Sequence, residues 1–465
     1  MRSRPRDALN EDAMQSRDGI PQAVYNFVSF DGGVRARGYL QQPDRYRFWR
    51  GSLDEAPRIS RGAGLSYSGA SFLADGLSVS HRSFDRVLDF DSGRNVIEVE
   101  TGVTMSALHR VLSARGLYLP VQPGHGRISV GGCIAADVHG KNQTRDGTFI
   151  NQVEEVTLVH PAHGILRLSP QRDAELFKLT CGGYGLTGHI IRAQLRASVA
   201  PSPWVKIRST PFQSAEEGFV RLRAAAQDVD FSYTWHDMSL AGAGFGAGFL
   251  IQGSFVPQER APAGNSAVSE APALSADGRA RFPVSLLNRF STRMLNFLYR
   301  RRHQSARHQR QLVTLADALF PTHKAQAYFH FFGAVGFREY QAILPHRAAT
   351  SYVDAIRSYL RERPLPITLS SAKVFAGSRE LLRYTGDGIS LALNMPGGAE
   401  ADMFMAFLDQ RVIELGGIPN IIKDSRLPRA VVDACYPEAD RFREALRAFD
   451  PKRLFRSDLS ERLKL

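Results

Sequence analysis

One glycine-rich stretch, residues 124–142, limits the possible folds of this chain more than any other feature. Its glycines alternate with small apolar residues, and a polar group follows at its end. Glycine lets a backbone approach a flat or phosphorylated ligand closely, and free N–H groups in such a loop bind anionic oxygens. A lone Gly-Gly pair is more often a plain turn before a helix. However, two more segments of the same character, residues 61–69 and 181–188, lie in the same half of the chain, and together the three loops predict one extended cofactor.

These loops together resemble the flavin-binding half of the vanillyl-alcohol-oxidase type of FAD oxidoreductases. In that group the first glycine loop wraps the pyrophosphate, and a Gly-Gly-x-Ile-Ala segment runs beside the flavin. Further motifs, in the same order along the chain, are similar to the decaprenylphosphoryl-β-D-ribose 2′-oxidase family. These motifs are Asp137-Val138-His139-Gly140-Lys141-Asn142, Asp173-Ala174-Glu175-Leu176-Phe177, Gly185-Leu186-Thr187-Gly188, Lys423-Asp424-Ser425-Arg426 and Phe455-Arg456-Ser457-Asp458-Leu459. The similarity runs from about residue 61 to the C-terminus and is weak between about 257 and 326.

The resemblance implies an α+β fold with two parts. A two-lobed FAD-binding domain of the PCMH type is expected over residues 20–202, and a sheet-based substrate or cap domain over residues 203–417. Residues 418–465 are expected to return to the FAD domain. At 465 residues the chain is long enough for two domains with substantial cores. Prolines around position 202 support the boundary, and a segment rich in Ala, Pro, Ser and Gly at about 257–280 is expected to be mobile.

Local patterns predict the elements that carry these loops. Alternation of apolar and polar residues indicates strands, and apolar residues at helical spacing indicate helices. The longest uncharged run, residues 238–258, is interrupted by glycines, so we expect strands around a turn there rather than a membrane span. Asp173 is expected to cap a helix. The main expected strands are 96–100, 153–159, 189–195, 204–209, 231–235 and 337–345, and the main expected helices are 105–115, 215–227 and 404–416.

The resemblance implies that FAD lies along the glycine loops and against the returning C-terminal segment. Many members of the superfamily attach FAD covalently through a histidine just after the Gly-x-Gly of the first loop, and Leu65 stands at that place. We therefore predict non-covalent FAD. The residues expected to surround it are Arg61, Gly62, Ala63, Gly64, Leu65, Ser66, Tyr67, Gly124, Ser129, Val130, Gly131, Gly132, Ala136, Asp137, Val138, His139, Ile190, Asn420 and Lys423.

Lys423 and His139 are the candidates for catalysis. Either could assist proton removal from an alcohol or stabilise the developing charge, and the sequence does not divide these roles. Positive charge beside a flavin stabilises its reduced form, which favours this role for Lys423 over a surface salt bridge. A lysine acting as a base would need a lowered pKa. His139 could equally be a hydrogen-bonded core histidine, and Lys141 and Asn142 are expected to orient the loop rather than touch substrate.

Tyr67, Trp235, Gln341 and Lys373 are the candidates for contact with the substrate. The resemblance places Trp235 and Gln341 in the substrate pocket. A lysine on an otherwise apolar strand is unfavourable to bury without an anion, so phosphate oxygens are a physical reason for Lys373. Each candidate has an alternative interpretation. Tyr67 and Trp235 could be buried core residues, and Gln341 and Lys373 could lie on a solvent-facing side of their strands.

The charge and cysteine content restrict the possible partners. With 59 basic and 46 acidic residues, the net charge of +13 attracts polyanions or an anionic membrane. The sequence has no helix-turn-helix, zinc-finger or ribonucleoprotein motif, so nucleic acid is not expected. Three separated cysteines indicate neither a disulfide framework nor a metal site, and no metal is predicted. A cytoplasmic location is expected, with a peripheral position at the inner face of the cell membrane as a variant of it.

One basic helix is predicted over residues 289–303. Phe290, Met294, Leu295 and Leu298 share one side of this helix, and arginines dominate elsewhere. This is the composition of a helix that lies in the membrane interface. A solvated basic helix packed on the core gives the same pattern, so both interpretations stay open. The family's lipid-linked substrate favours the membrane.

The resemblance implies an FAD-dependent oxidoreductase that removes hydride from a secondary alcohol of a sugar. In the family the substrate is the 2′-hydroxyl of polyprenyl-phosphoryl-ribose, a lipid-linked sugar phosphate, and the product is the keto sugar. A separate NADH-dependent short-chain reductase then completes epimerisation to arabinose for cell-envelope polysaccharide. An FAD-dependent aldonolactone or soluble sugar-alcohol oxidase is the nearest alternative. A non-catalytic, flavin-binding scaffold at the membrane is an alternative of another class.

Overall fold

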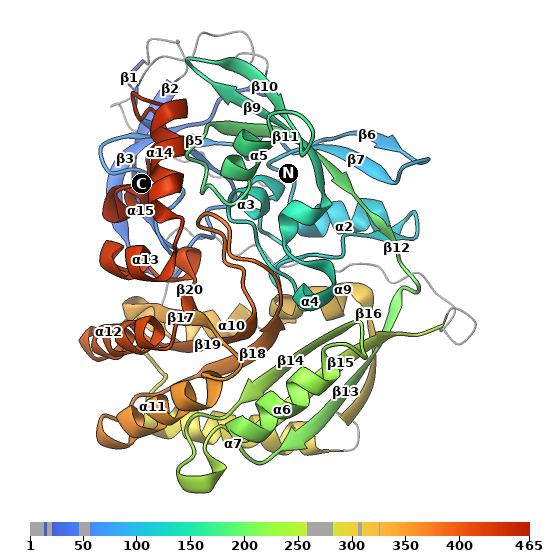
Figure 1. The fold of residues 1–465 in the computed structure, drawn as a ribbon, viewed down its shortest axis with the longest axis vertical. Coiled ribbons are helices and arrows are strands. Elements are labelled where there is room, and N and C mark those ends of the chain that lie inside the picture. Colours follow the sequence, from blue (N-terminus) through green and yellow to red (C-terminus); the bar gives the residue numbers. More distant parts are fainter. Residues whose placement is uncertain (1–13, 16–20, 46–55, 258–281, 306–308, 325) are drawn as a thin grey trace, which may run out of the picture.

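The structure is a computed structural model that describes residues 14–15, 21–45, 56–257, 282–305, 309–324 and 326–465. Two sheet-based parts lie one above the other, and the C-terminal helices, drawn in red, flank the upper part (Figure 1). Within these ranges, no helix is long and apolar enough to cross a membrane. The predicted mobility of residues 257–280 falls outside the described residues except at position 257.

The N-terminal part contains two five-stranded sheets. The first has the order β1-β2-β3-β5-β4, and β4 leads directly into the first glycine loop. The second has the order β10-β9-β11-β7-β6 and packs against short helices through a core that includes Ile97, Leu108 and Phe177. The strands are β1 (Met14–Gln15), β2 (Pro21–Val28), β3 (Arg35–Gln41), β4 (Arg58–Arg61), β5 (Leu77–Ser80), β6 (Val87–Asp91), β7 (Val96–Glu100), β9 (Val153–His160), β10 (Gly164–Leu168) and β11 (His189–Arg196). The helices are α2 (Met105–Ser113), α3 (Val130–Ala135), α4 (Gln143–Asp146) and α5 (Ala174–Thr180).

The second part is built on one eight-stranded antiparallel sheet with the order β16-β13-β15-β14-β18-β19-β17-β20. Two short strands, β8 (Leu117–Tyr118) and β12 (Ser198–Val199), pair near the connection between the parts. The strands of the large sheet are β13 (Trp204–Phe212), β14 (Phe231–His236), β15 (Gly248–Phe255), β16 (Arg310–Thr314), β17 (Phe337–Leu344), β18 (Leu369–Phe375), β19 (Gly388–Pro396) and β20 (Ile418–Pro419).

Helices cover both faces of this sheet. On one face α6 (Ala215–Ala225), α11 (Ala349–Glu362) and α12 (Ala399–Glu414) form a layer that shares one apolar core with the strands. On the other face the FAD-binding part covers β17, β18 and β19, and α7 (Arg289–Gln304) crosses β14 and β15. Because both faces are covered, β17 is buried along nearly its whole length. The short helices α9 (Leu315–Leu319) and α10 (Gln326–His330) connect this region.

The C-terminal segment packs on the N-terminal part. Its helices are α13 (Arg429–Cys435), α14 (Ala439–Phe449) and α15 (Asp458–Leu463). Between α14 and α15 the chain pairs with β4: Arg58 N donates to Leu454 O at 2.8 Å, and Arg456 N donates to Arg58 O at 3.0 Å. The tail therefore fixes the strand that precedes the first glycine loop. Residues 418–419 form β20, so the substrate sheet ends two residues later than predicted.

Most predicted elements are present within a few residues, and two local predictions are wrong. The strand predicted at 96–100 is β7, and the helix predicted at 404–416 overlaps α12, which begins earlier, at Ala399, and ends at Glu414. Of the run predicted as strands around a turn, the structure describes residues 238–257; these contain a turn at the glycines and then β15, while the strand before the turn, β14, already ends at His236. Asp173 precedes α5, but it has a φ of +54° and its side chain makes no capping bond, so it is not the predicted side-chain cap.

Candidate functional site

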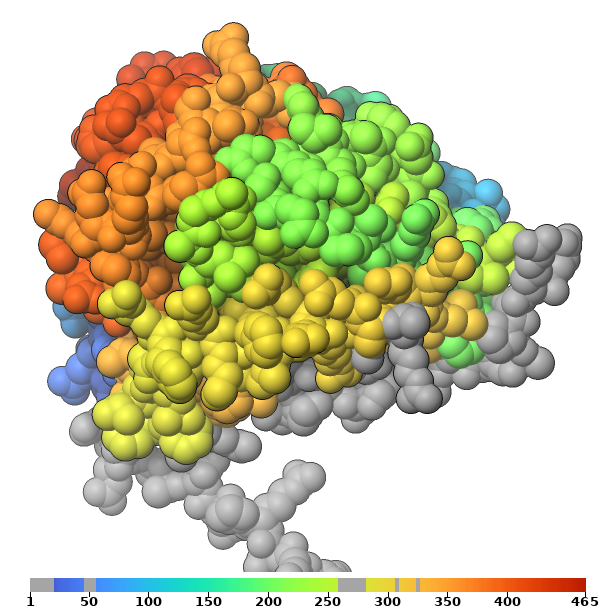
Figure 2. Space-filling view, turned by 90° about the horizontal axis from the view of Figure 1, so that it is seen from below, coloured from blue at the N-terminus to red at the C-terminus, as the bar shows by residue number. Residues whose placement is uncertain are grey.

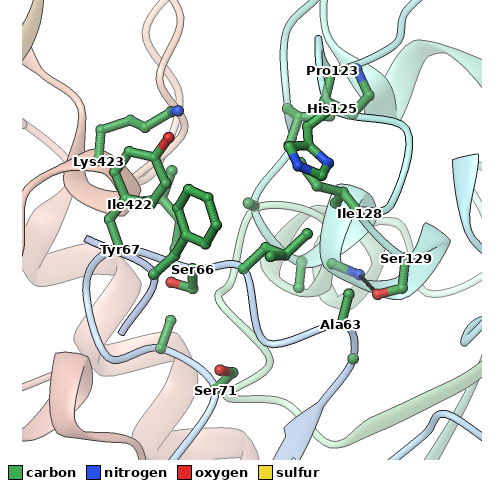
Figure 3. A pocket seen from close by; sticks show the side chains of 18 of the residues that line it. Ala63, Ser66, Tyr67, Ser71, Pro123, His125, Ile128, Ser129, Ile422 and Lys423 are labelled. Atoms are coloured by element: carbon green, nitrogen blue, oxygen red, sulfur yellow. Dashed lines mark hydrogen bonds between the residues drawn. The ribbon is translucent and has the colours of Figure 1, made fainter. Parts of the chain in front are cut away.

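A cavity of about 370 Å³ lies between the glycine loops and the face of the large sheet that α6 does not cover. Figure 3 shows part of its wall: Lys423 and Tyr67 face the cavity from one side, and Ala63 and Ser129 from the other. The predicted site residues that line it are Gly62, Ala63, Gly64, Leu65, Ser66, Tyr67, Gly124, Ser129, Gly131, Gly132, Ala136, Asp137, Val138, His139, Ile190, Gln341, Lys373, Asn420 and Lys423.

The first glycine loop presents free hydrogen-bond donors to this cavity. The backbone N–H groups of residues 62–67 donate to no other residue in the described part of the chain. The loop is held from behind, because Phe30 N donates to Ser66 O at 3.0 Å. A run of unsatisfied N–H groups along a cavity wall fits an anionic pyrophosphate. Residues 62–67 are therefore suited to hold the diphosphate of FAD.

The second glycine loop packs closely on the first. Ser129 caps α3, since its Oγ accepts a hydrogen bond from Gly132 N at 3.3 Å. A Cβ added at Gly62 would lie only 2.2 Å from Ser129 Oγ, and a Cβ added at Gly131 would lie 3.0 Å from Thr101 Cβ. Side chains larger than hydrogen do not fit at either position without displacing a neighbour. The glycines thus bring the two loops together around one ligand.

Asp137 holds the turn that follows α3. Its carboxylate accepts hydrogen bonds from Thr148 Oγ1 and from Ile150 N, both at 2.8 Å. Burial raises the pKa of Asp137, and the guanidinium of Arg383, 3.9 Å away, opposes that rise. Asp137 itself has a φ of +41°. Its side-chain bonds stabilise this unusual backbone and so position the next residues, including His139.

His139 joins the glycine loops to the substrate sheet. Gln341 Nε2 donates to His139 Nε2 at 3.3 Å, and His139 Nδ1 lies 3.1 Å from the Gly140 carbonyl oxygen, which places the ring proton on Nδ1. Asn420 Nδ2 in turn donates to Gln341 Oε1 at 2.8 Å. Burial, followed by the charge of Lys373, holds the pKa of His139 well below its ordinary value. The imidazole is therefore neutral at neutral pH.

Lys423 and Lys373 give the cavity its positive charge. Lys423 Nζ lies 3.4 Å from Glu339 Oε1 and 4.2 Å from the centre of the Tyr67 ring. Burial acts against the ammonium of Lys423, but Glu339 and Tyr67 outweigh it and raise its pKa. Burial raises the pKa of Tyr67 to about 12. Lys373 Nζ lies 3.4 Å from His139 Nδ1, and burial, with the charge of Lys423, lowers the pKa of Lys373 to about 8.

Three predicted site residues lie outside the cavity wall. Arg61 is buried behind the first loop, where its Nη1 donates to Ser71 Oγ at 3.0 Å and its guanidinium lies over Phe27. Val130 points into the core behind the second loop. Trp235 is the clearest correction. It faces the same side of the sheet as Ser371, but it stacks on Phe249 and lies under α7 rather than in the cavity.

Lys141 and Asn142 hydrogen-bond from the second loop to neighbouring backbone carbonyls. Lys141 Nζ donates to the Ala318 carbonyl oxygen and lies 5.3 Å from the centre of the Tyr233 ring. Asn142 Nδ2 donates to Pro120 O at 3.2 Å. Neither residue lines the large cavity. Burial, then the charge of Lys373, lowers the pKa of Lys141 to about 7.

Sequence reasoning missed the partners of the predicted residues. Glu339 neutralises Lys423, and Ser390 Oγ accepts from Gln341 Nε2 at 3.2 Å. The Tyr384 hydroxyl lies 2.8 Å from Ser390 Oγ. Glu339 could have been found, since it is two positions before Gln341 on one strand and so shares its face. Tyr384 lies in a loop and carried no such signal.

Comparisons with known proteins agree with this geometry. A family model described as an FAD binding domain matches residues 54–169, which include the first two glycine loops. The chain is 28% identical over 414 residues to decaprenylphosphoryl-β-D-ribose oxidase of Mycolicibacterium smegmatis, covering 88% of this chain and 89% of that protein. It is 32% identical to L-galactono-1,4-lactone dehydrogenase 2 of Oryza sativa subsp. japonica, over only 34% of this chain and 27% of that protein.

A third relative also matches only part of the chain. The chain is 25% identical to D-lactate dehydrogenase of Anaerostipes hadrus over 32% of each protein. These two partial matches each cover about a third of the chain, whereas the match to the ribose oxidase covers 414 residues and therefore includes both parts of the fold. The chain is an FAD-dependent oxidoreductase, and it is similar along most of its length to decaprenylphosphoryl-β-D-ribose oxidase.

Proposed function

We propose that the protein oxidises a secondary alcohol of a sugar, and that this alcohol is the 2′-hydroxyl of a polyprenyl-phosphoryl-ribose. The observation that carries the proposal is the group of Lys423, Glu339, His139, Gln341 and Lys373, which meet where the glycine loops face the large sheet. The name of the relative that matches both parts of the chain supports the choice of sugar. The product is the keto sugar, and an NADH-dependent short-chain reductase would complete epimerisation to arabinose.

The protonation state of each cavity residue determines the role that it can have in the reaction. Bound FAD supplies the hydride acceptor. Lys423 keeps its proton because Glu339 and Tyr67 raise its pKa, so it donates a hydrogen bond to the substrate oxygen rather than acting as a base. His139 is neutral and can accept a proton within the same cluster. Lys373 is the candidate for holding the phosphate of the substrate.

We also propose that FAD is bound without a covalent bond. Leu65 lines the cavity at the place where relatives have the histidine that attaches the cofactor, and its side chain has no nucleophilic atom. The free N–H groups of residues 62–67 support reversible binding of the diphosphate. After acid precipitation, the yellow flavin is expected to stay in the supernatant. Flavin that stays with the pellet would contradict this proposal.

The function is tested by the visible absorption spectrum of the FAD-loaded protein under anaerobic conditions. Addition of a polyprenyl-phosphoryl-ribose is expected to bleach the flavin, and free ribose is not. L-galactono-1,4-lactone and soluble sugar alcohols serve as comparison substrates, because a lactone dehydrogenase is among the partial matches. Bleaching by these compounds alone would favour a soluble-substrate oxidase. No bleaching by any alcohol would leave a flavin-binding protein without this activity.

The phosphate role of Lys373 predicts a pH dependence of substrate binding. A lysine is charged below its pKa, and the pKa of Lys373 is about 8. Because a phosphodiester does not titrate in this range, KM is expected to be constant below about pH 8 and to rise up to about tenfold per pH unit above it. The check is the pH profile of KM for the wild type and for Lys373→Arg. Arginine stays charged above pH 8, so the KM of this variant should not rise there. If the KM of Lys373→Arg rises above pH 8 as it does in the wild type, deprotonation of Lys373 is not the cause of the rise.

A further inference from the structure

Helix α7 packs on the protein with its polar side. Its buried residues are Thr292 and Asn296. Asn296 Nδ2 donates to Asp237 Oδ1 at 2.9 Å, and Arg300 Nε lies 3.0 Å from Asp237 Oδ2. Asp237 is itself buried. These contacts fix the rotation of the helix about its axis, so which side faces outward is determined by the fold.

The outward side of α7 is apolar. Phe290 is 77% exposed, and Met294, Phe297 and Leu298 are also exposed. These four positions are spaced at i, i+4, i+7 and i+8, which places them on one face opposite Asn296. A surface helix of a water-soluble domain normally has the reverse arrangement, with its apolar face toward the core. In Figure 2 the yellow segment that contains α7 runs across the outer surface of the molecule.

Basic residues surround this apolar face. Residues 282–305 contain five arginines and no acidic residue. Arg289, Arg293, Arg301 and Arg302 are exposed. The guanidinium of Arg301 lies 5.4 Å from the centre of the Phe297 ring. Exposed apolar side chains flanked by arginines match the chemistry of an anionic lipid surface, in which acyl chains lie beneath phosphate groups.

Apolar residues also lie in the segment that precedes α7, and this segment leads toward the cavity. Phe282, Val284 and Leu286, which precede the helix, are exposed. Leu286 N donates to Phe331 O at 2.9 Å, which fixes this segment beside the chain that leads to β17. The next residue, Leu287, is buried in a cluster with Phe332 and Phe337, against which Phe329 and Tyr67 pack.

Phe329 and Tyr67 also line the large cavity. A packed apolar cluster therefore reaches from Leu287, just before α7, to the wall of the cavity.

We propose that residues 282–302 dock the protein on an anionic phospholipid bilayer, with α7 in the plane of the interface. Phe290, Met294, Phe297 and Leu298 enter the acyl boundary, and the arginines contact lipid phosphates. Docking places the cavity next to the membrane. That consequence for a lipid-linked substrate rests on the proposed function, whereas the docking itself rests on the structure of α7 alone.

The test is co-sedimentation of the full-length, FAD-loaded protein with lipid vesicles. The wild type is expected to bind vesicles of phosphatidylcholine with phosphatidylglycerol, and to bind weakly to phosphatidylcholine alone. Replacing both Phe290 and Phe297 by glutamine should lower the partition coefficient at least about tenfold, since two large apolar groups no longer leave water. Arg293→Gln with Arg301→Gln should weaken binding to the anionic vesicles only, and added salt should do the same.

A matched control uses exposed apolar residues on helices of the opposite sheet face. Val220 on α6 and Met403 on α12 are exposed, so V220Q/M403Q removes similar groups and should leave vesicle binding unchanged. Wild-type protein that does not bind anionic vesicles would overturn the proposal. So would a wild-type dimer that F290Q/F297Q converts to a monomer, which would identify a second copy of the chain as the partner. Neither result depends on turnover, so the proposed function is tested separately.

Discussion

Replacing Lys423 by methionine is expected to lower the rate of flavin reduction by the sugar substrate about 10²–10³-fold, the usual effect of removing one donor to a developing oxyanion. The ammonium of Lys423 is held charged beside Glu339 and Tyr67 and faces the cavity. Methionine keeps the length and bulk of the side chain but provides no charge. The measurement is the loss of flavin absorbance after rapid anaerobic mixing with substrate.

A lower rate in Lys423→Met could come from loss of the ammonium or from a structural change in the cavity, and further variants distinguish the two. Lys423→Met leaves the Glu339 carboxylate without its partner, which is unfavourable for a buried charge. The double variant K423M/E339Q removes both charges and should restore stability but not rate. Lys178→Met, in a partly exposed pair with Glu380, is the control for loss of a lysine elsewhere. A K423M enzyme that reduces its flavin at the wild-type rate would show that Lys423 has no part in the reaction.

Replacing Gly62 by alanine is expected to weaken FAD binding about ten- to a hundredfold, because overpacking of a close contact costs about 1–3 kcal/mol. The added Cβ would lie 2.2 Å from Ser129 Oγ, so the first loop or the cap of α3 must move. Either movement disturbs the N–H groups that face the cavity. The check is the Kd for FAD from quenching of flavin fluorescence, together with the flavin content of the purified protein.

A second substitution tests this cause directly. Ser129→Ala removes the oxygen that the new Cβ meets, so G62A/S129A should recover part of the lost affinity even though S129A alone costs α3 its cap. Gly244→Ala is the control, since a Cβ there meets nothing within 4 Å. If the double variant binds FAD no better than G62A, the contact with Ser129 Oγ is not the cause.

Local motifs, together with their resemblance to a known flavoprotein family, were enough to place most of the site. The glycine loops, the strand with Gln341 and the returning segment with Lys423 were each recognisable from residues close in sequence, and all line the cavity. The prediction for Trp235 had the correct strand and face but the wrong neighbour. Strand alternation determines which face a side chain joins, and it does not say what covers that face at a given strand. At Trp235 the sheet face is covered by α7.

The division of chemical roles also depended on tertiary contacts. Lys423 and His139 were equal candidates in the sequence. In the structure Glu339 raises the pKa of Lys423, and burial lowers the pKa of His139. A pKa is determined by charges and desolvation that residues distant in sequence provide, so local sequence cannot supply it.

By itself, the sequence determined the cofactor class, the two-part fold and the amphipathic character of residues 289–303. Glycine spacing and hydrophobic period are local properties, so they could be read directly. Only the tertiary structure decided which side of that helix meets the protein. Its period is the same whether the apolar side faces the core or the solvent, and the buried carboxylate of Asp237, which binds Asn296 and Arg300, turns the apolar side outward.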